Sequence, residues 1–186
     1  MEITFKWLED FISGGALPET VVQHLFEKML KMDCSILTKA GFTVFERFFV
    51  FINEKNNRIK RFEDKTPCLV AADAVGISTL WDIALDNNDN AVAEMAITSL
   101  NGLHQNFEIL GSKSKSTKMR EDYIADSMDR LHKAASHLND KNNKQRLERM
   151  LRLLKNYVES FDKKPDNQKS KNKAQNKGER PGMQLK

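Results

Sequence analysis

The chain has 186 residues, of which 40% are hydrophobic and 30% charged, and it contains only four Pro and eight Gly. This length can bury one substantial core, and the composition is typical of a soluble helical protein. The composition excludes a membrane-spanning protein, because no apolar run approaches the roughly 18 residues that a membrane helix needs. It also excludes a disulfide framework, because the chain has two cysteines, Cys34 and Cys68.

The positive charge of the chain is concentrated at its C-terminal end. The whole chain carries a formal charge of +4, but residues 163–186 hold eight Lys or Arg against two acidic residues, a net charge of +6. Residues 1–162 therefore carry a net charge of −2, which does not support a general nucleic-acid surface. Residues 163–186 are almost free of apolar side chains and cannot offset the entropy of ordering. We predict a helical repeat domain at residues 1–162 and a disordered Lys-rich tail or linker at residues 163–186.

Apolar residues at helical spacing predict an all-α chain of roughly seven helices. In chain order, the expected helices are Ile3–Ile12, a helix opening at Pro18, Thr38–Asn53, a short helix at Cys68–Val75, Ser78–Leu85, Ala91–Asn106, Lys118–Leu138 and Asn143–Phe161. The inward face of the first helix is expected to hold Trp7, Leu8, Phe11 and Ile12. No segment shows the alternation of a strand, and Gly111–Ser116 is expected to be a flexible polar link.

Two of these helices carry complementary apolar stripes. The stripe of the third helix consists of large residues, Phe42, Phe45, Phe49 and Ile52. The stripe of the helix at Ala91–Asn106 consists mostly of small ones, Ala93, Ala96, Ile97, Leu100 and Leu103. A stripe of large apolar residues must be covered by a neighbouring helix, and a stripe of small residues lets two helices approach each other closely. The pattern predicts stacked antiparallel helix pairs in an armadillo/HEAT-like superhelical fragment, with the third helix in a central position covered on two sides.

The last two helices are expected to form an antiparallel hairpin, because only the short link Asn139–Asn142 joins them. Their predicted inward stripes are Ile124, Met128, Leu131, Ala135 and Leu138, followed by Leu147, Met150, Leu151, Leu154, Val158 and Phe161. We therefore predict that Phe45 and Leu151 are buried, and that replacing either with Ala costs about 2–5 kcal/mol.

No residue pattern in the chain indicates catalysis or a cofactor. His132 and His137 are five residues apart, which does not fit a zinc-binding helix, and all four histidines (His24, His104, His132 and His137) are expected on solvated helix surfaces. Cys34 and Cys68 are expected to be structural thiols rather than nucleophiles. Ser13-Gly14-Gly15 is a helix stop rather than a phosphate-binding loop. We predict no catalytic, cofactor-binding or metal-binding residues in this chain and no small-molecule substrate.

Several polar groups have simpler interpretations than a binding site. Asp82, Asp86 and Asp89 lack the spacing of a calcium loop, so we interpret them as capping and turn residues. An exposed row such as Glu94 and Asn101 is a conceivable contact surface for a partner. The Lys-rich tail could bind RNA, anionic lipid or an import receptor, but its scattered lysines without aromatics favour a solubilising linker.

A series of motifs recurs in an order known from one family. The motifs are Leu37-Thr38-Lys39-Ala40-Gly41-Phe42, Phe45-Glu46, Phe48-Phe49, Asn53, Gly76-Ile77-Ser78-Thr79-Leu80-Trp81, Asn88-Asp89, Val92-Ala93, Ala96-Ile97, Tyr123-Ile124, Met128-Asp129-Arg130-Leu131, Arg149-Met150-Leu151-Arg152-Leu153-Leu154 and Tyr157-Val158. From about Leu37 to Phe161 the chain thereby resembles a helical region of the very large ubiquitin-specific proteases, the fat facets type and its giant relatives.

The resemblance implies a non-catalytic armadillo- or HEAT-like segment of a deubiquitinase. The catalytic Cys and His boxes of that family have no counterpart in this sequence, so no catalytic residue is transferred. The implied partners are ubiquitinated substrates or adaptor proteins. We expect no binding to a membrane, and binding to nucleic acid only through the Lys-rich tail. The alternative function is a free-standing helical-repeat adaptor in intracellular trafficking or signalling. Residues 3–12 do not resemble a signal peptide, and we expect a cytoplasmic protein, with the nucleus as a second compartment.

Overall fold

A computed structural model describes residues 2–14, 17–61, 66–105, 112–136 and 140–162. The helices in these ranges are α1 (Glu2–Gly14), α2 (Glu19–Met29), α3 (Lys39–Lys55), α4 (Ile77–Asp86), α5 (Asn90–Leu103), α6 (Lys113–Ala135) and α7 (Lys141–Asp162), with a short 3-10 helix, η1 (Cys34–Ile36). The prediction of an all-α fold is confirmed. No helix in the described ranges is both long and apolar enough to cross a membrane. The predicted tail at residues 163–186 lies outside the described residues.

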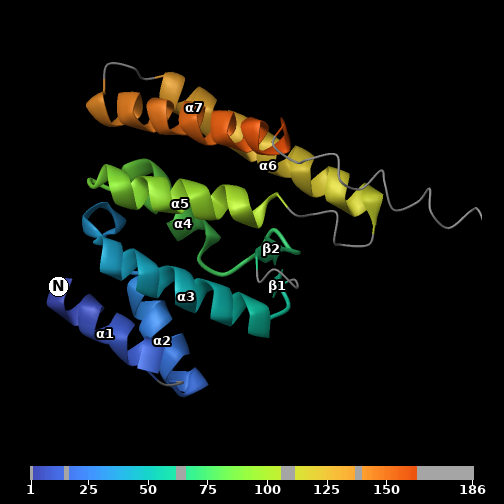
Figure 1. Ribbon diagram of the computed structural model, residues 1–186. Helices are drawn as coiled ribbons and strands as arrows, with labels where there is room; N and C mark the ends of the chain where they lie inside the picture. The colour runs from blue at the N-terminus through green and yellow to red at the C-terminus, as the bar shows by residue number, and fades with distance from the viewer. Residues whose placement is uncertain (1, 15–16, 62–65, 106–111, 137–139, 163–186) are drawn as a thin grey trace, which may run out of the picture.

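The helices form a stack whose two ends are far apart (Figure 1). The pair α1 and α2 lies at one end and packs on α3, which in turn packs on α5. The pair α4 and α5 comes next, and α7 packs on both of these helices. The pair α6 and α7 closes the other end, with the two helices running in opposite directions. This arrangement confirms that α3 is central, while the assignment to the armadillo or HEAT type stays a prediction.

Both apolar stripes predicted for the core are buried. Phe42, Phe45 and Phe49 are at most 1% exposed, and Ile52 of the same helix is also buried. The small-residue stripe of α5 is fully buried as well, from Ala93 to Leu103. The aromatic rings of α3 pack against one another and against Phe26 of α2.

Side-chain caps set the beginnings of three helices. The Thr38 hydroxyl accepts from the Gly41 N–H at 3.2 Å, and the Asp89 carboxylate accepts from the Ala91 N–H at 2.8 Å. The Ser112 hydroxyl accepts from the N–H of Lys115 at 3.4 Å, so α6 begins at Lys113, five residues before the predicted start. The prediction of a flexible link extending to Ser116 is therefore wrong for the residues from Lys113 onward.

A small antiparallel hairpin replaces the short helix predicted at Cys68–Val75. Strand β1 (Ile59–Arg61) pairs with β2 (Pro67–Leu69), with Ile59 opposite Leu69. Asn57 takes a left-handed conformation (φ 55°) directly after α3, which turns the chain out of the helix and into β1. Ile59, Cys68 and Leu69 are buried against the helices. Two runs of three residues give too little alternation for strands to be recognised from the sequence.

The predicted inward face of α1 is wrong for its two largest side chains. Phe5 is buried and Leu8 and Ile12 are half-buried, whereas Trp7 is 62% and Phe11 50% exposed. The helix is apolar around much of its circumference, and only one side of it packs on α3. A hydrophobic pattern of that width does not determine which part of the circumference is covered.

The stripe predicted for the α6–α7 hairpin is only partly confirmed. As predicted, Met150 is buried, and four further members are half-buried: Leu131, Leu147, Leu154 and Phe161. Leu138 lies outside the described residues. Leu151 is 53% exposed, so its predicted burial is wrong, and Ile124, Met128 and Val158 are exposed as well. The buried side chains of these helices are Tyr123, Ser127, Ala134, Arg149, Met150, Leu153 and Tyr157. Each of the two helices has two adjacent stripes of side chains. The stripe that contains a tyrosine, Tyr123 in α6 and Tyr157 in α7, faces α4 and α5.

Two glycines in contrasting environments provide a stability test. Gly76 precedes α4 at φ +84°, and a Cβ there would lie 2.8 Å from the ring of Phe26 and 3.0 Å from Leu30. Gly76→Ala is therefore expected to lower the free energy of unfolding by about 1–3 kcal/mol. Gly102 of α5 has no atom within 4 Å of its Cβ position, so Gly102→Ala should raise the free energy of unfolding by about 0.5–1 kcal/mol. Urea denaturation of both variants checks the pair, and equal effects would contradict it.

Candidate functional site

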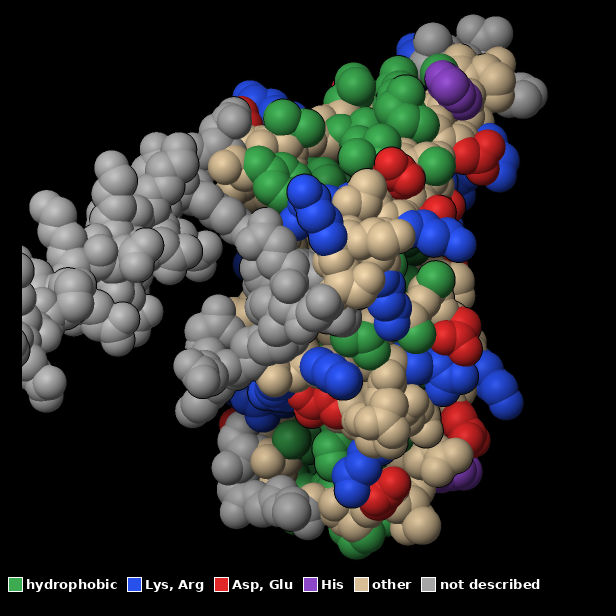
Figure 2. Space-filling view, turned by 90° about the vertical axis from the view of Figure 1, so that its right-hand side faces the viewer, with side chains coloured by type: hydrophobic (Ala, Val, Ile, Leu, Met, Phe, Trp, Pro, Cys, Tyr) green, Lys and Arg blue, Asp and Glu red, His purple; other side chains and the backbone are tan. Residues whose placement is uncertain are grey.

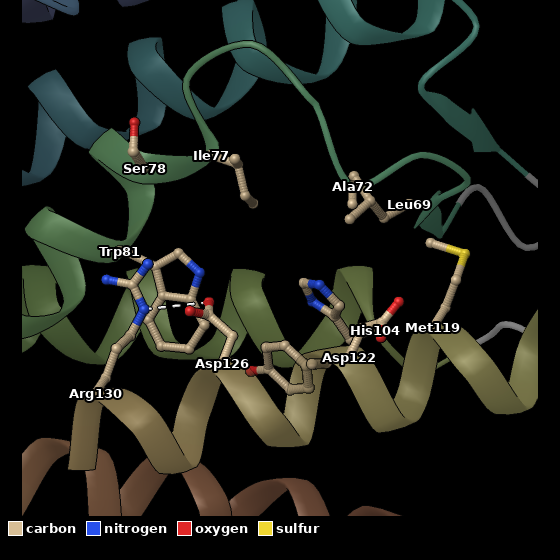
Figure 3. A pocket seen from close by; sticks show the side chains of 11 residues that line it. Leu69, Ala72, Ile77, Ser78, Trp81, His104, Met119, Asp122, Asp126 and Arg130 are labelled. Atoms are coloured by element: carbon tan, nitrogen blue, oxygen red, sulfur yellow. Dashed lines mark hydrogen bonds and ion pairs between the residues drawn. The ribbon is translucent and has the colours of Figure 1, made fainter. Parts of the chain in front are cut away.

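A pocket of about 310 Å³ opens between α4, α6, the C-terminal end of α5 and the segment that follows β2 (Figure 3). Its lining combines aromatic, acidic and basic side chains with aliphatic ones. The lining residues are Leu69, Ala72, Ile77, Ser78, Trp81, His104, Met119, Asp122, Tyr123, Asp126 and Arg130. These residues are far apart in the sequence, and the stacking of helices brings them together.

A cluster of aromatic rings forms the inner wall of the pocket. The His104 ring stacks on Tyr123 with 3.8 Å between the ring centroids, and the ring of Trp81 lies 5.8 Å from Tyr123. Tyr157 of α7 meets Tyr123 edge-on at 4.9 Å. All four side chains are buried. The cluster therefore joins one ring from each of α4, α6 and α7 with the residue that follows α5.

Hydrogen bonds hold the polar ends of these rings inside the protein. The Tyr123 hydroxyl donates to Oδ1 of Asn101 at 2.8 Å, and Nδ2 of Asn101 donates to the Leu153 carbonyl at 3.1 Å. The Tyr157 hydroxyl donates to the His104 carbonyl at 3.0 Å. Burial raises the pKa of Tyr123 well above its usual range and the pKa of Tyr157 to about 12. Both phenols are therefore neutral donors at physiological pH.

His104 corrects the prediction that every histidine is a solvated surface residue. It is 6% exposed, and its Nδ1 lies 2.7 Å from the Leu100 carbonyl, an arrangement in which Nδ1 carries a proton and donates. Burial lowers the pKa of His104 to about 4. His24 and His132 are exposed as predicted, and His137 lies outside the described residues. A neutral imidazole with one nitrogen bound to the backbone and one face covered by Tyr123 is a structural group rather than a general base.

The depressed pKa of His104 predicts a pH dependence of stability. In the unfolded chain this imidazole binds a proton near pH 6.5, whereas in the fold it does so only near pH 4. The unfolded state therefore binds more protons between these values, and stability is lost as the pH falls from about 6.5 towards 4. We expect His104 to account for about 2 kcal/mol of the difference between pH 7 and pH 5.

The measurement is urea denaturation of the wild type and of His104→Gln at both pH values. The variant should lose less stability on acidification than the wild type, because Gln does not titrate. Identical losses would show that His104 is not a buried neutral group.

The outer wall of the pocket is charged. Nε of Arg130 donates to Asp126 at 3.2 Å, and its guanidinium lies 4.5 Å from the centre of the Trp81 ring (Figure 3). Asp122 and Asp126 are exposed carboxylates on the same helix. The pocket thus offers an aromatic surface and acidic groups for recognition, without an activated nucleophile and base side by side among its described residues.

The two cysteines lie apart from this pocket, in environments that disfavour the thiolate. Cys68 is fully buried on β2, and burial raises its pKa to about 11. Cys34 in η1 is half-buried, and burial together with the negative charges of Asp82, Asp86 and Asp33 raises its pKa. Both thiols are protonated at neutral pH, as expected of structural cysteines.

The predicted capping role of the acidic cluster holds for Asp89, which caps α5. Asp86 instead forms an ion pair with Arg146 of α7 through two hydrogen bonds of 2.5 and 2.8 Å. In the described ranges, no group of three or more His, Cys, Asp or Glu side chains is placed to hold a metal ion.

The suggestion that Glu94 and Asn101 form an exposed row is wrong. Asn101 is 3% exposed and holds Tyr123, as described above. Glu94 is half-buried and forms an ion pair with Arg152 of α7. Helix α5 is thus covered by α7 on the side that was suggested to be exposed.

Three buried polar side chains bind backbone groups of distant segments and act as clamps between layers. Asn53 of α3 exchanges two hydrogen bonds with the backbone of Val75, at 2.8 and 2.9 Å. Asn87 donates to the carbonyls of Cys34 and Leu37, at 2.6 and 3.0 Å. Buried polar groups that are fully hydrogen-bonded in this way fix one arrangement of neighbouring elements.

Arg149 is the third clamp and the most buried charged group among the described residues. It is 3% exposed and donates at 2.8 Å to the carbonyls of Leu85 and Asn87 and to Oδ1 of Asn90. It thereby ties α7 to the turn between α4 and α5. This role of Arg149 was not predicted from the sequence, although one signal was available: Arg149 directly precedes Met150 and lies on the same helix face as Leu153.

The comparisons with known proteins agree with the resemblance described above. No protein-family model matches the chain. Ubiquitin carboxyl-terminal hydrolase 24 of Mus musculus is 31% identical over 141 residues, which are 74% of this chain and 5% of the relative. Ubiquitin carboxyl-terminal hydrolase 9Y of Homo sapiens is 28% identical over 178 residues, which are 87% of this chain and 7% of the relative.

Ubiquitin carboxyl-terminal hydrolase puf of Drosophila melanogaster is 26% identical over 164 residues, covering 84% of this chain and 4% of the relative. The chain thus spans only a few per cent of the length of the relatives it matches. The predicted resemblance is confirmed: over most of its length this chain is homologous to a small segment of the large ubiquitin carboxyl-terminal hydrolases.

Proposed function

We propose that this chain is a non-catalytic, helical scaffold segment of a deubiquitinase, which positions ubiquitinated substrates or adaptor proteins for an active site elsewhere. The observation that carries this proposal is the unequal coverage in the comparisons. Most of this chain matches only 4–7% of each relative, so the chain corresponds to one small part of a much larger hydrolase.

The packing of the chain supports a scaffold role. Clamps such as Arg149 and Asn87 bind backbone carbonyls of neighbouring layers, which gives the stack one defined geometry. The raised pKa values of Cys34 and Cys68 disfavour the thiolate that a cysteine protease requires. A rigid stack of this kind holds binding surfaces at fixed distances.

The first test is an activity assay on the purified chain with a ubiquitin–fluorophore substrate. We expect no hydrolysis above that of a matched preparation of the Cys34→Ser, Cys68→Ser double variant. Hydrolysis by the wild type that disappears in the double variant would overturn the proposal.

The second test concerns partners. Cross-linking mass spectrometry in cell extract should recover ubiquitinated proteins or their adaptors with this chain. The control is an unrelated helical protein of the same size and charge. Equal recovery of ubiquitin conjugates on chain and control would contradict the positioning role.

We also propose a cytoplasmic location, which follows from the expectation of a reduced pair of cysteines. Imaging of a fluorescent fusion checks it, and fluorescence confined to the secretory pathway would contradict it.

A further inference from the structure

The outer face of the α6–α7 hairpin exposes a group of apolar side chains. Ile124 and Met128 of α6 are 44% and 37% exposed, and Leu151 and Val158 of α7 are 53% and 60% exposed. They are spaced four residues apart on α6 and seven residues apart on α7, so each pair lies on one helix face. Figure 2 shows apolar side chains gathered over this end of the molecule. Exposed apolar side chains gathered at one end of a protein are typical of an interaction site.

The opposite end of the stack carries a second exposed apolar group. Trp7 and Phe11 of α1 are 62% and 50% exposed, and their rings stack on each other with 5.4 Å between the centroids. The helix α1 and the α6–α7 pair lie at opposite ends of the molecule (Figure 1). Stacked helical arrays normally end in layers with a polar outer face. Among the described residues, the outer faces of α1 and of the α6–α7 hairpin instead carry the exposed apolar side chains named above.

The two ends also have opposite charge. Helices α1 and α2 together contain two Lys against five Asp or Glu; Glu19 pairs with Lys55 of α3, and the remaining side chains carry a formal charge of −2. Helices α6 and α7 together contain twelve Lys or Arg against seven Asp or Glu; Arg146, Arg149 and Arg152 bind groups of α4, α5 or the turn between them, and the remaining side chains carry a formal charge of +2. Opposite charges around two apolar groups favour contact between unlike ends, and like charges disfavour contact between two α6–α7 ends.

We propose that the α6–α7 end of this chain binds the α1–α2 end of a second copy, in a head-to-tail arrangement. The contact continues the stacking already present inside the molecule, since each end offers apolar side chains that a neighbouring helix layer would cover. Because the two faces differ, the interface is heterologous, and further copies can add at the free ends.

Sedimentation velocity of the purified chain over a series of concentrations tests this proposal. We expect the wild type to form dimers and longer assemblies as the concentration rises. Leu151→Glu and Trp7→Gln should each raise the dissociation constant by about tenfold or more, since each removes an exposed apolar group from one face. Ile36→Glu is the matched control: Ile36 is 50% exposed but lies in η1, which packs on α4, and its replacement should leave assembly unchanged.

A mixture of the two variants gives the sharpest result. Trp7→Gln keeps an intact α6–α7 face and Leu151→Glu keeps an intact α1 face, so the mixture should form dimers that do not grow further. A wild type that stays monomeric at its highest soluble concentration would overturn the proposal. Assembly of Trp7→Gln alone as strongly as the wild type would also overturn it, because that outcome shows contact between like ends. Thermal melts of each variant confirm that it is folded, and the outcome is independent of the ubiquitin assays above.

Discussion

Phe45→Ala is expected to lower the free energy of unfolding by about 3–5 kcal/mol. Phe45 is 1% exposed at the centre of α3, and its ring lies 5.6 Å from that of Phe26 and 6.1 Å from that of Phe49. Removing the ring leaves a cavity between α2, α3 and the next layer, which close packing around it cannot fill. Urea denaturation followed by circular dichroism measures the loss.

Leu151→Ala is the matched control for this prediction. Leu151 also lies in an aliphatic helical stripe, but its side chain is 53% exposed. Its replacement should therefore change the stability of the monomer by no more than about 0.5 kcal/mol. Comparable losses for Phe45→Ala and Leu151→Ala, measured at a concentration where the chain is monomeric, would contradict the burial described here.

Arg149→Met is expected to cost about 2–4 kcal/mol of folding free energy, because it removes three hydrogen bonds, two of them to buried backbone carbonyls. The methionine keeps most of the length of the side chain, so the loss reports the missing donors rather than a cavity. The acceptors that lose the Arg149 donor belong to Leu85, Asn87 and Asn90, at the turn on which α7 is anchored. We expect α7 to become more open to amide hydrogen exchange in this variant.

Arg152→Met provides the comparison for the second substitution. Arg152 lies three residues along the same helix and forms an ion pair with Glu94, with its side chain half exposed. Exposed ion pairs contribute at most about 1 kcal/mol, so this variant should be close to the wild type. A loss for Arg152→Met as large as that for Arg149→Met would show that the charge, and not the buried clamp, stabilises α7.

These two predictions differ in how far the sequence supports them. The burial of Phe45 follows from a stripe of phenylalanines at helical spacing, because such a stripe cannot remain in water on a central helix. The position of Arg149 on the helix face of Leu153 does not by itself predict its role as a clamp, because arginine is usually exposed and its acceptors are about 60 residues away in the chain. Only the packing of α7 on α4 and α5 brings the donors and acceptors together.

The pocket lined by Trp81 and Tyr123 shows the same limit. Trp81 and Tyr123 occur in two separate motifs of the family resemblance, but nothing in those motifs brings the two rings together, and His104 was expected in solvent. The aromatic cluster exists because α4, α6 and α7 each place one ring near His104, the residue that follows α5. The depressed pKa of His104 is a property of that burial, so it could not be obtained from the residue type.

The amino-acid sequence alone determined the helical class, the central position of α3 and the relationship to a segment of ubiquitin carboxyl-terminal hydrolases. It could do so because helix periodicity and the order of motifs are local properties of the chain. The tertiary structure decided which of two adjacent apolar stripes on α1, α6 and α7 is covered. The physical reason is that a helix apolar over a wide face can pack through either part of it, and only the neighbouring helices determine which part remains in water.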